Sequence, residues 1–149
     1  MADQAGRSDP LRVWFRLMRL ETRMRTSVAE GLRAIGLSVP QCDVLTTLTE
    51  KEGVSQQDLA KRLYVTKGNI SGLIDRLVAA GLVERRAIAA DMRQHAIYLT
   101  PAGRGAAEQA IAFQRRFVAR TIGRLPEEEL STLERLLIAT RDLVRAPGE

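Results

Sequence analysis

Hydrophobic residues recur at helical spacing in the middle of the chain, between residues 55 and 81. Ser55 can cap a first short helix through its side-chain oxygen, and Thr66 can cap a second one in the same way. The apolar positions of the first are Leu59, Ala60 and Leu63. Those of the second are Ile70, Leu73, Ile74, Leu77 and Val78, one stripe at i, i+3, i+4, i+7 and i+8. Gly81 ends the second helix, because glycine enters the left-handed cap conformation at little cost. The pattern predicts two consecutive helices joined by a tight turn.

Two short runs after Gly81 have the character of strands. Residues 83–88 and 96–99 can pair as strands, and the polar, charged segment 89–94 lies between them as a loop. Two helices followed by a β-hairpin make a winged helix-turn-helix. We therefore predict a mainly helical fold with a two-stranded β-wing.

Long amphipathic helices are expected on both sides of this unit. Pro10 begins one that ends at Gly36, Ser38 caps another over 39–50, and Thr100-Pro101 starts a third that runs to about residue 122. A last helix follows Pro126, with Glu127, Glu128 and Glu129 at the positive end of its dipole. A monomer of 149 residues has trouble covering the apolar stripes of the first and the last two helices. We predict one domain, with the winged unit at about 38–100 and dimerisation helices at about 10–36 and 101–146, which interleave in a two-fold homodimer.

These residues resemble the MarR (multiple-antibiotic-resistance regulator) family of bacterial transcription factors. The first helix has the spacing S-x-x-x-L-A-x-x-L, and the second ends in L-x-x-x-G-L-V-x-R. The wing carries D-x-R at Asp91 and Arg93, and the exit is L-T-x-x-G at Leu99, Thr100 and Gly103. Gln94 stands where the family often has a second arginine. The motifs occur in order, and the flanking helices extend the resemblance over nearly the whole chain.

The resemblance implies a sequence-specific DNA-binding regulator. We expect a cytoplasmic homodimeric repressor that binds double-stranded DNA at a palindromic operator and is released by a small phenolic or aromatic carboxylate-type effector. The ligand-binding residues are not identified by the sequence. No cofactor, metal or membrane partner is expected.

The positive net charge of the chain favours a polyanionic partner such as nucleic acid. The 23 Lys and Arg exceed the 18 Asp and Glu, for a net charge of +5. The winged unit carries several basic residues, among them Lys67, Arg76, Arg85, Arg86 and Arg93. The predicted DNA-binding residues are Ser55, Gln56, Thr66, Lys67, Gly68, Asn69, Ser71, Arg76, Arg86 and Arg93. Asp75 is acidic on the same face, and we expect it to orient a neighbouring arginine. By resemblance, Asp91 supports Arg93 in the wing, where a guanidinium at a loop tip can enter a minor groove.

The sequence offers few residues that could act in catalysis. His95 is the only histidine and falls on a predicted wing strand, where a structural or phosphate-facing role is expected. Gly68-x-x-x-Gly72 lies inside a helix without the following Lys-Ser or Lys-Thr of a phosphate loop. The first ten residues have no apolar segment, and no later apolar run is long enough to span a bilayer. We predict that the protein is not an enzyme.

Two alternative functions stay open. Cys42, the only cysteine, could make the protein a redox-switched regulator, although family members that sense peroxide carry their cysteine near the start of the first helix. A small buried hydrophobic role is the default for Cys42. The other alternative is a helical oligomerisation module without DNA binding.

Trp14 with Asp43 is similar to a pair in the urate-responsive branch of the family, but we expect Trp14 to be a core residue.

Overall fold

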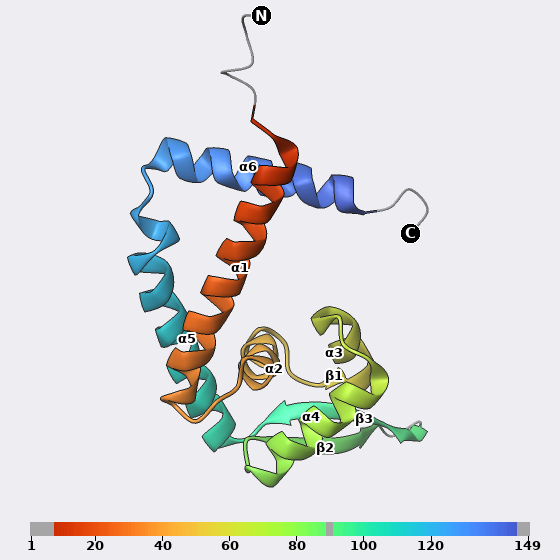
Figure 1. The fold of residues 1–149 in the computed structure, drawn as a ribbon. Coiled ribbons are helices and arrows are strands. Elements are labelled where there is room, and N and C mark those ends of the chain that lie inside the picture. The colour runs from red at the N-terminus through yellow and green to blue at the C-terminus, as the bar shows by residue number, and fades with distance from the viewer. Residues whose placement is uncertain (1–7, 89–90, 146–149) are drawn as a thin grey trace, which may run out of the picture. The chain divides into compact units, whose positions relative to one another are not determined.

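The computed structural model describes residues 8–88 and 91–145, and the side chains within them except those of residues 91 and 92. The chain divides into two compact units, residues 1–113 and 114–149, which are described separately. The first unit contains α1 (Pro10–Arg33), α2 (Val39–Glu50), β1 (Val54–Ser55), α3 (Gln56–Leu63), α4 (Lys67–Ala79), β2 (Val83–Ile88), β3 (Asp91–Leu99) and most of α5 (Pro101–Arg120) (Figure 1). The second contains the end of α5, a 3-10 turn at Ile122–Arg124, and α6 (Glu127–Val144).

Side-chain caps fix where the helices of the first unit begin. The hydroxyl of Ser55 accepts a hydrogen bond from the Asp58 backbone N–H at 3.1 Å, and that of Thr66 accepts one from the Asn69 N–H at 3.2 Å. Ser38 caps α2 in a reciprocal capping box with Gln41. These bonds satisfy backbone donors that the first helical turn leaves unpaired. The predicted starts of these three helices are confirmed.

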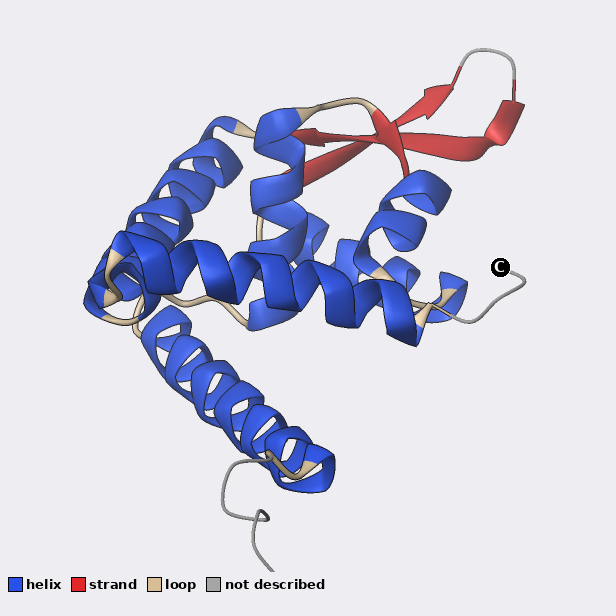
Figure 2. Ribbon diagram, turned by 90° about the horizontal axis from the view of Figure 1, so that it is seen from above, coloured by secondary structure: helices blue, strands red, loops and turns tan. Residues whose placement is uncertain are grey.

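The sheet has one strand more than the sequence predicts. β1 pairs with β3, and β3 pairs with β2, both antiparallel, so that the strand order is β1-β3-β2. The two residues of β1, Val54 and Ser55, lie opposite Ile97 and Ala96. A strand of two residues has no alternating pattern by which the sequence could reveal it. β2 and β3 project past α4 as the wing (Figure 2).

The prediction of a loop over residues 89–94 was wrong for residues 91–94, and residues 89 and 90 lie outside the described residues. β3 begins at Asp91, so Arg93 and Gln94 belong to the strand. The ladder is irregular there: Ala87 pairs with His95, whereas Ile88 pairs with Asp91. The extra residues of β3 across this step form a bulge, which interrupts the two-residue alternation on which strand prediction depends.

The core of the first unit is aliphatic, in keeping with an aromatic content of only 4% in the sequence. Leu32 of α1, Leu45 and Leu48 of α2, Leu59 of α3, Ile74 and Leu77 of α4 and Ile97 of β3 are all fully buried. Val78, predicted in the α4 stripe, is 39% exposed. Its position lies at the edge of the stripe, where the helix surface turns away from the core.

The L-T-x-x-G motif joins α5 to the end of α4. The Thr100 hydroxyl donates to the Gly81 carbonyl at 2.6 Å and accepts from the Gly103 N–H at 3.0 Å. A Cβ at Gly103 would collide with the carbonyl oxygen of Leu82, so the helix approaches this turn only with glycine at that position. The motif thus has a packing role.

Large apolar side chains stay exposed on two helices. The first three turns of α1 expose Leu11, Val13, Trp14, Phe15, Met18 and Leu20. α6 has no buried residue, and Leu136, Leu137, Ile138, Leu143 and Val144 are exposed on it. The prediction that Trp14 is a core residue was wrong within one chain, because its side chain is 52% exposed and meets Phe15 edge to face. Among the described residues, no helix is long and apolar enough to cross a membrane.

Candidate nucleic-acid interface

The surface of α4 opposite its buried stripe is polar. Residues three, four and seven apart share one side of a helix, which places Gly68, Gly72 and Arg76 in one row and Asn69 beside them. Asn69 and Arg76 are exposed, and Thr66, Lys67 and Gly68 are exposed at the start of the helix. A Cβ built at Gly68 or at Gly72 would meet no atom within 4 Å. The face therefore presents a bare helix backbone flanked by an amide and a guanidinium.

A groove of about 720 Å³ lies beside the start of α4. It brings together four of the predicted DNA-binding residues, one each from β1, α3, α4 and β3: Ser55, Gln56, Lys67 and Arg93. Lys61, Tyr64 and His95 also line it. Lys61 and Tyr64 were not predicted in the interface, and the expectation for His95 was a structural or phosphate-facing role. With Lys61, Lys67 and Arg93 around one groove, its rim is positively charged, as a phosphate backbone requires. The groove and the polar face of α4 together are the candidate interface.

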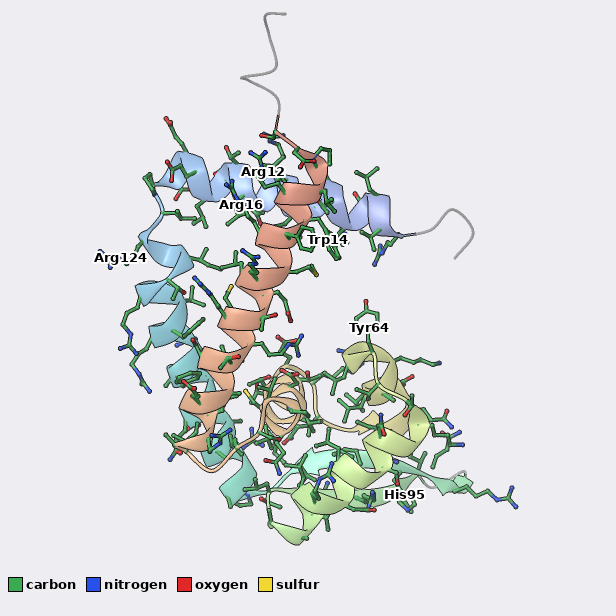
Figure 3. All side chains as sticks on the ribbon, in the orientation of Figure 1. Arg12, Trp14, Arg16, Tyr64, His95 and Arg124 are labelled. Carbon is green, nitrogen blue, oxygen red and sulfur yellow. The ribbon has the colours of Figure 1, made fainter. Side chains whose placement is uncertain are left out.

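Tyr64 has an unusual conformation in this groove. It is the residue after α3, it adopts a left-handed backbone with φ of 54°, and its side chain is 90% exposed. Figure 3 shows its ring at the end of α3, pointing away from the sheet, whereas His95 lies at the sheet. Residues with large side chains rarely adopt the left-handed backbone conformation. The turn between α3 and α4 explains the conformation, but the hydrophobic pattern offered no sign of the exposed ring.

Arg85 connects α4 to the sheet. Its Nη1 lies 2.6 Å from the Asp75 carboxylate, its Nη2 donates to the Ser71 carbonyl at 3.3 Å, and its Nε donates to the Gln56 side-chain oxygen at 3.2 Å. The expectation that Asp75 orients a neighbouring arginine is confirmed. The oxygen of Gln56 is already an acceptor for Arg85, which leaves its amide nitrogen as the group able to reach DNA.

Arg86 lies on the other face of the sheet. Successive side chains of a strand point to opposite faces, so Arg86 faces away from α4 when Arg85 faces toward it. Its guanidinium pairs with Glu84 and stacks over the Tyr98 ring, 3.9 Å from the ring centroid. The structure does not bring Arg86 together with the other predicted residues, and a prediction based on charge alone could not tell the two arginines apart.

Arg93 lies in the irregular part of β3 and is exposed, not in a loop tip as predicted. Its predicted supporting residue, Asp91, has a described backbone, but its side chain lies outside the described residues. The support of Arg93 by Asp91 stays a prediction. Arg93 nevertheless lines the groove with Lys67, so strand β3 contributes a cation to the same surface as α4.

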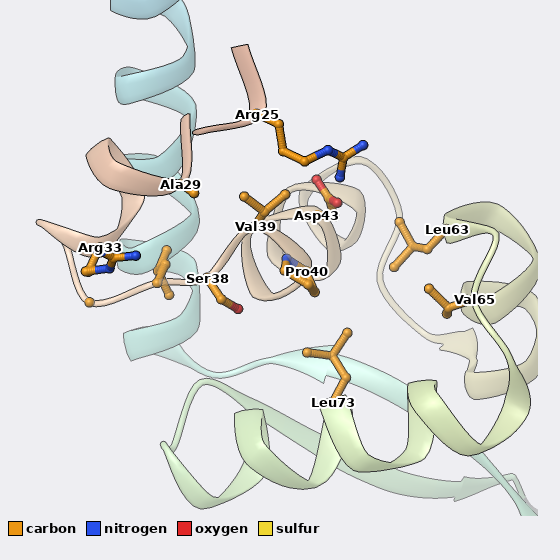
Figure 4. Close-up of a pocket in the computed structure, with 12 residues that line it drawn as sticks. Arg25, Ala29, Arg33, Ser38, Val39, Pro40, Asp43, Leu63, Val65 and Leu73 are labelled. Atoms are coloured by element: carbon orange, nitrogen blue, oxygen red, sulfur yellow. The ribbon is translucent and has the colours of Figure 1, made fainter. Parts of the chain in front are cut away.

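A second cavity of about 770 Å³ lies between α1, α2 and the helix-turn-helix. Its wall is mostly apolar, with Leu37, Val39, Leu63, Val65 and Leu73 among the lining residues. Its charged lining residues are Arg25 and Arg33 of α1 and Asp43 of α2, and the side chains of Arg25 and Asp43 point toward each other in Figure 4. Burial raises the pKa of Asp43, and the charge of Arg25 acts in the opposite direction.

Trp14 does not reach this second cavity. Trp14 precedes Arg25 by eleven residues of one helix, which corresponds to roughly 16 Å along the helix axis. The structure therefore does not bring Trp14 together with Asp43, and the similarity to the urate-responsive pair is limited to the sequence.

Cys42 has the surroundings of a structural residue. Its side chain is 1% exposed in the core of the first unit. Burial raises the pKa of the thiol to about 11, and the neighbouring charge of Asp43 adds to this shift. Peroxide reacts with an accessible thiolate, so a buried thiol with a raised pKa is a poor sensor. These features favour the default interpretation of Cys42 as a small buried hydrophobe over the redox alternative.

Comparison with known proteins relates the chain to transcription regulators. The family model for the MarR family matches residues 35–94. The HTH-type transcriptional repressor Rv2887 of Mycobacterium tuberculosis is 30% identical over 132 residues, which are 89% of this chain and 95% of that protein. The HTH-type transcriptional regulator TtmR of Methylorubrum extorquens is 34% identical over 113 residues, 68% of this chain, and the match spans only 54% of TtmR.

A solved structure of the same fold contains DNA. The crystal structure of mutant MarR from E. coli complexed with operator DNA superposes with a TM-score of 0.76 at 27% identity, over 89% of this chain and 99% of that one. The relatives and the fold favour the DNA-binding interpretation over that of a helical oligomerisation module.

Proposed function

We propose that this chain, which belongs to the MarR family of DNA-binding transcription regulators, is a homodimeric repressor that a small ligand releases from a palindromic operator. The observation that carries the proposal is the polar, glycine-lined face of α4 beside a groove edged by Lys61, Lys67 and Arg93. No apolar side chain of the α4 core stripe occupies this face. A helix with such a face fits the major groove of B-DNA, which is about 12 Å wide.

The start of α4 is the part that reads bases. In helix-turn-helix proteins, the N-terminal residues of the second helix reach the base edges. Asn69 is exposed there, and its amide can donate to and accept from adenine at once. Thr66, Lys67, Gly68 and Ser71 surround it, and Arg76 follows two turns later on the same flank as Asn69. Asn69 is the base-reading residue, and the cations around it bind phosphate.

The wing supplies a contact outside the major groove. Arg93 leaves β3 on the side of the groove, where it reaches a phosphate or a narrow minor groove next to the site of α4. Replacing it, Arg93→Ala, should weaken binding to all sequences and lower the salt slope of affinity by about one unit. A salt titration of wild type and variant on one duplex measures this. Equal affinities at every salt concentration would mean that the wing does not touch DNA.

A second copy of the chain covers the exposed apolar residues. The start of α1 and the whole of α6 expose large side chains that a single chain leaves in water. Monomeric soluble proteins seldom expose such continuous apolar surface. Interleaved terminal helices bury it and hold two α4 helices about one turn of DNA apart, which requires a palindrome of roughly 16 to 20 base pairs.

The cavity lined by Arg25 and Asp43 is the site for the releasing ligand. Its apolar wall and few charged groups suit an aromatic acid, whose carboxylate can pair with Arg25 or Arg33. The lining residues come from α1 and from the helix-turn-helix. A ligand bound between α1 and the helix-turn-helix therefore favours one angle between these two parts of the chain. An angle that moves the two α4 helices out of register with successive turns of DNA lowers operator affinity.

The experiment is a selection of duplexes from a random pool by the full-length protein, followed by salt titration. We expect enrichment of a palindrome and a decrease in affinity with salt, with a slope near 0.9 per neutralised phosphate. Aromatic carboxylates are then added to the bound complex, and Arg25→Met is the variant in which release should be lost. No enriched sequence and no salt dependence would contradict the proposal.

A further inference from the structure

We propose that Arg85 is a positioning residue, which fixes α4 against the wing and thereby sets the preference for operator over other DNA. This inference rests on the proposed function, because it concerns how the same surface discriminates between sequences. Arg85 does not act by touching DNA. It acts through Asp75, Ser71 and Gln56, which it holds in one arrangement.

Each of the three guanidinium nitrogens of Arg85 has a partner. Nη1 pairs with Asp75 at 2.6 Å, Nη2 donates to the Ser71 carbonyl at 3.3 Å and Nε donates to Gln56 at 3.2 Å. Its side chain is only 24% exposed. A planar group with donors in a fixed fork transmits orientation as well as attraction.

These bonds join α4, α3 and β2. Ser71 and Asp75 are one turn apart on the flank of α4, Gln56 is the first residue of α3, and Arg85 itself is on β2, which pairs with the strand of Arg93. The remaining contacts of α4 with the core are made by aliphatic side chains, which attract without a preferred direction. The bonds of Arg85 therefore decide the rotation and the slide of α4 relative to the wing.

The negative charge of Asp75 allows this assignment to be tested. A carboxylate that is 63% exposed beside the base-reading residues repels the phosphates of DNA. If only long-range charge mattered, its removal would strengthen binding. If Asp75 holds Arg85 in place, its removal weakens binding to the operator. The two effects have opposite signs, which makes Asp75 the decisive position.

The test compares affinity for the selected operator with affinity for a scrambled duplex of the same length, at several salt concentrations. Asp75→Ala should lower the ratio of the two affinities on the order of tenfold, while binding to the scrambled duplex stays equal or becomes tighter. Alanine is the better helix former, so α4 stays folded. Arg85→Met should lower the ratio similarly without changing the salt slope. Arg85→Lys should restore part of the ratio, because an ammonium can pair with Asp75 but cannot hold Gln56 and Ser71 at once.

Arg104→Met is the matched control. It removes the same charge from an exposed pair with Glu52 at the start of α5, and the ratio should stay at the wild-type value. An Asp75→Ala variant with an unchanged ratio would overturn the inference. So would an Arg85→Met variant that lowers the salt slope by about one unit and keeps the ratio, because this is the behaviour of a phosphate contact. A wild-type protein that prefers no sequence would instead refute the proposed function, and this inference with it.

Discussion

The winged unit and the terminal helices carry similar hydrophobic patterns, but the winged unit buries its pattern within one chain, whereas α6 and the start of α1 leave theirs exposed. On α4, Ile70, Ile74 and Leu77 are at most 1% exposed. On α6, which has an equally regular stripe, Leu136 and Leu137 are each 50% exposed and no residue is buried. An amphipathic pattern shows that a helix needs an apolar partner. It does not show whether the same chain supplies that partner.

The difference separates two kinds of stability. The winged unit is held by contacts within the chain, so its free energy of unfolding does not depend on protein concentration. The terminal helices, in our proposal, gain their burial from a second copy, so their free energy depends on concentration through mass action. Variants in the two regions should therefore behave differently on dilution.

The largest effect is expected in the core of the winged unit. Leu45 is fully buried, and Leu45→Asp places a carboxylate there without a partner. Its cost, several kcal/mol or more, approaches the roughly 5–15 kcal/mol that stabilises a typical domain. We expect an unfolded protein at every concentration, measured by circular dichroism. A cooperative thermal transition near that of the wild type would contradict the assignment of this core.

The same substitution on α6 should break assembly instead. Leu137→Asp puts a carboxylate into the proposed dimer interface, at a cost of several kcal/mol, but disturbs nothing in the core of residues 1–113. Light scattering at micromolar concentration should give the dimer mass for wild type and the monomer mass for the variant. A monomeric wild type would show that the comparison between the two regions is mistaken.

A smaller effect is expected at the base-reading position. Asn69→Ala should cost on the order of 1–3 kcal/mol at one base pair of each half-site and little elsewhere. Arg76→Ala is the comparison, because removing a phosphate-binding guanidinium from the same helix weakens binding to all sequences alike. Affinities for a set of single-base operator variants measure both. An unchanged base preference in Asn69→Ala would refute its role.

The smallest effect is expected for Gly72→Ala, which should stabilise the fold but weaken binding to the operator. Gly72 lies inside α4, and a Cβ there meets no atom, so Gly72→Ala should raise the free energy of unfolding by about 0.5–1 kcal/mol. The added methyl group lies on the face that approaches DNA and should weaken operator binding. Gly105→Ala is the matched control, because Gly105 is equally unobstructed on α5. It should stabilise the fold and leave binding unchanged; equal binding in both variants would remove Gly72 from the interface.

Local signals predicted most of the fold. Ser38, Ser55 and Thr66 cap helices where the sequence indicated, because a cap depends on residues only three positions apart. The extent of β3 could not be predicted, because its bulge depends on pairing with β2. The exposure of Trp14 was missed for a similar reason: the periodicity that places it beside a stripe does not say what covers the stripe.

The candidate site was predicted less completely than the fold. Lys67 and Asn69 follow from the position of the helix start, and the role of Asp75 followed from its charge. The sequence could not separate Arg85 from Arg86, because which of two neighbours faces α4 depends on the register of β2. Lys61, in the last turn of α3, and Tyr64, directly after it, line the groove only because tertiary structure brings them beside β3.

The mass of the protein bound to its selected operator tests the central claim most directly. Light scattering of the purified complex counts how many copies of the 16.5 kDa chain one duplex carries. We predict two copies on a duplex with one palindrome, and loss of this complex in Leu137→Asp. One copy per duplex, or a Leu137→Asp complex of wild-type mass and affinity, would contradict a dimer that presents two winged units to DNA.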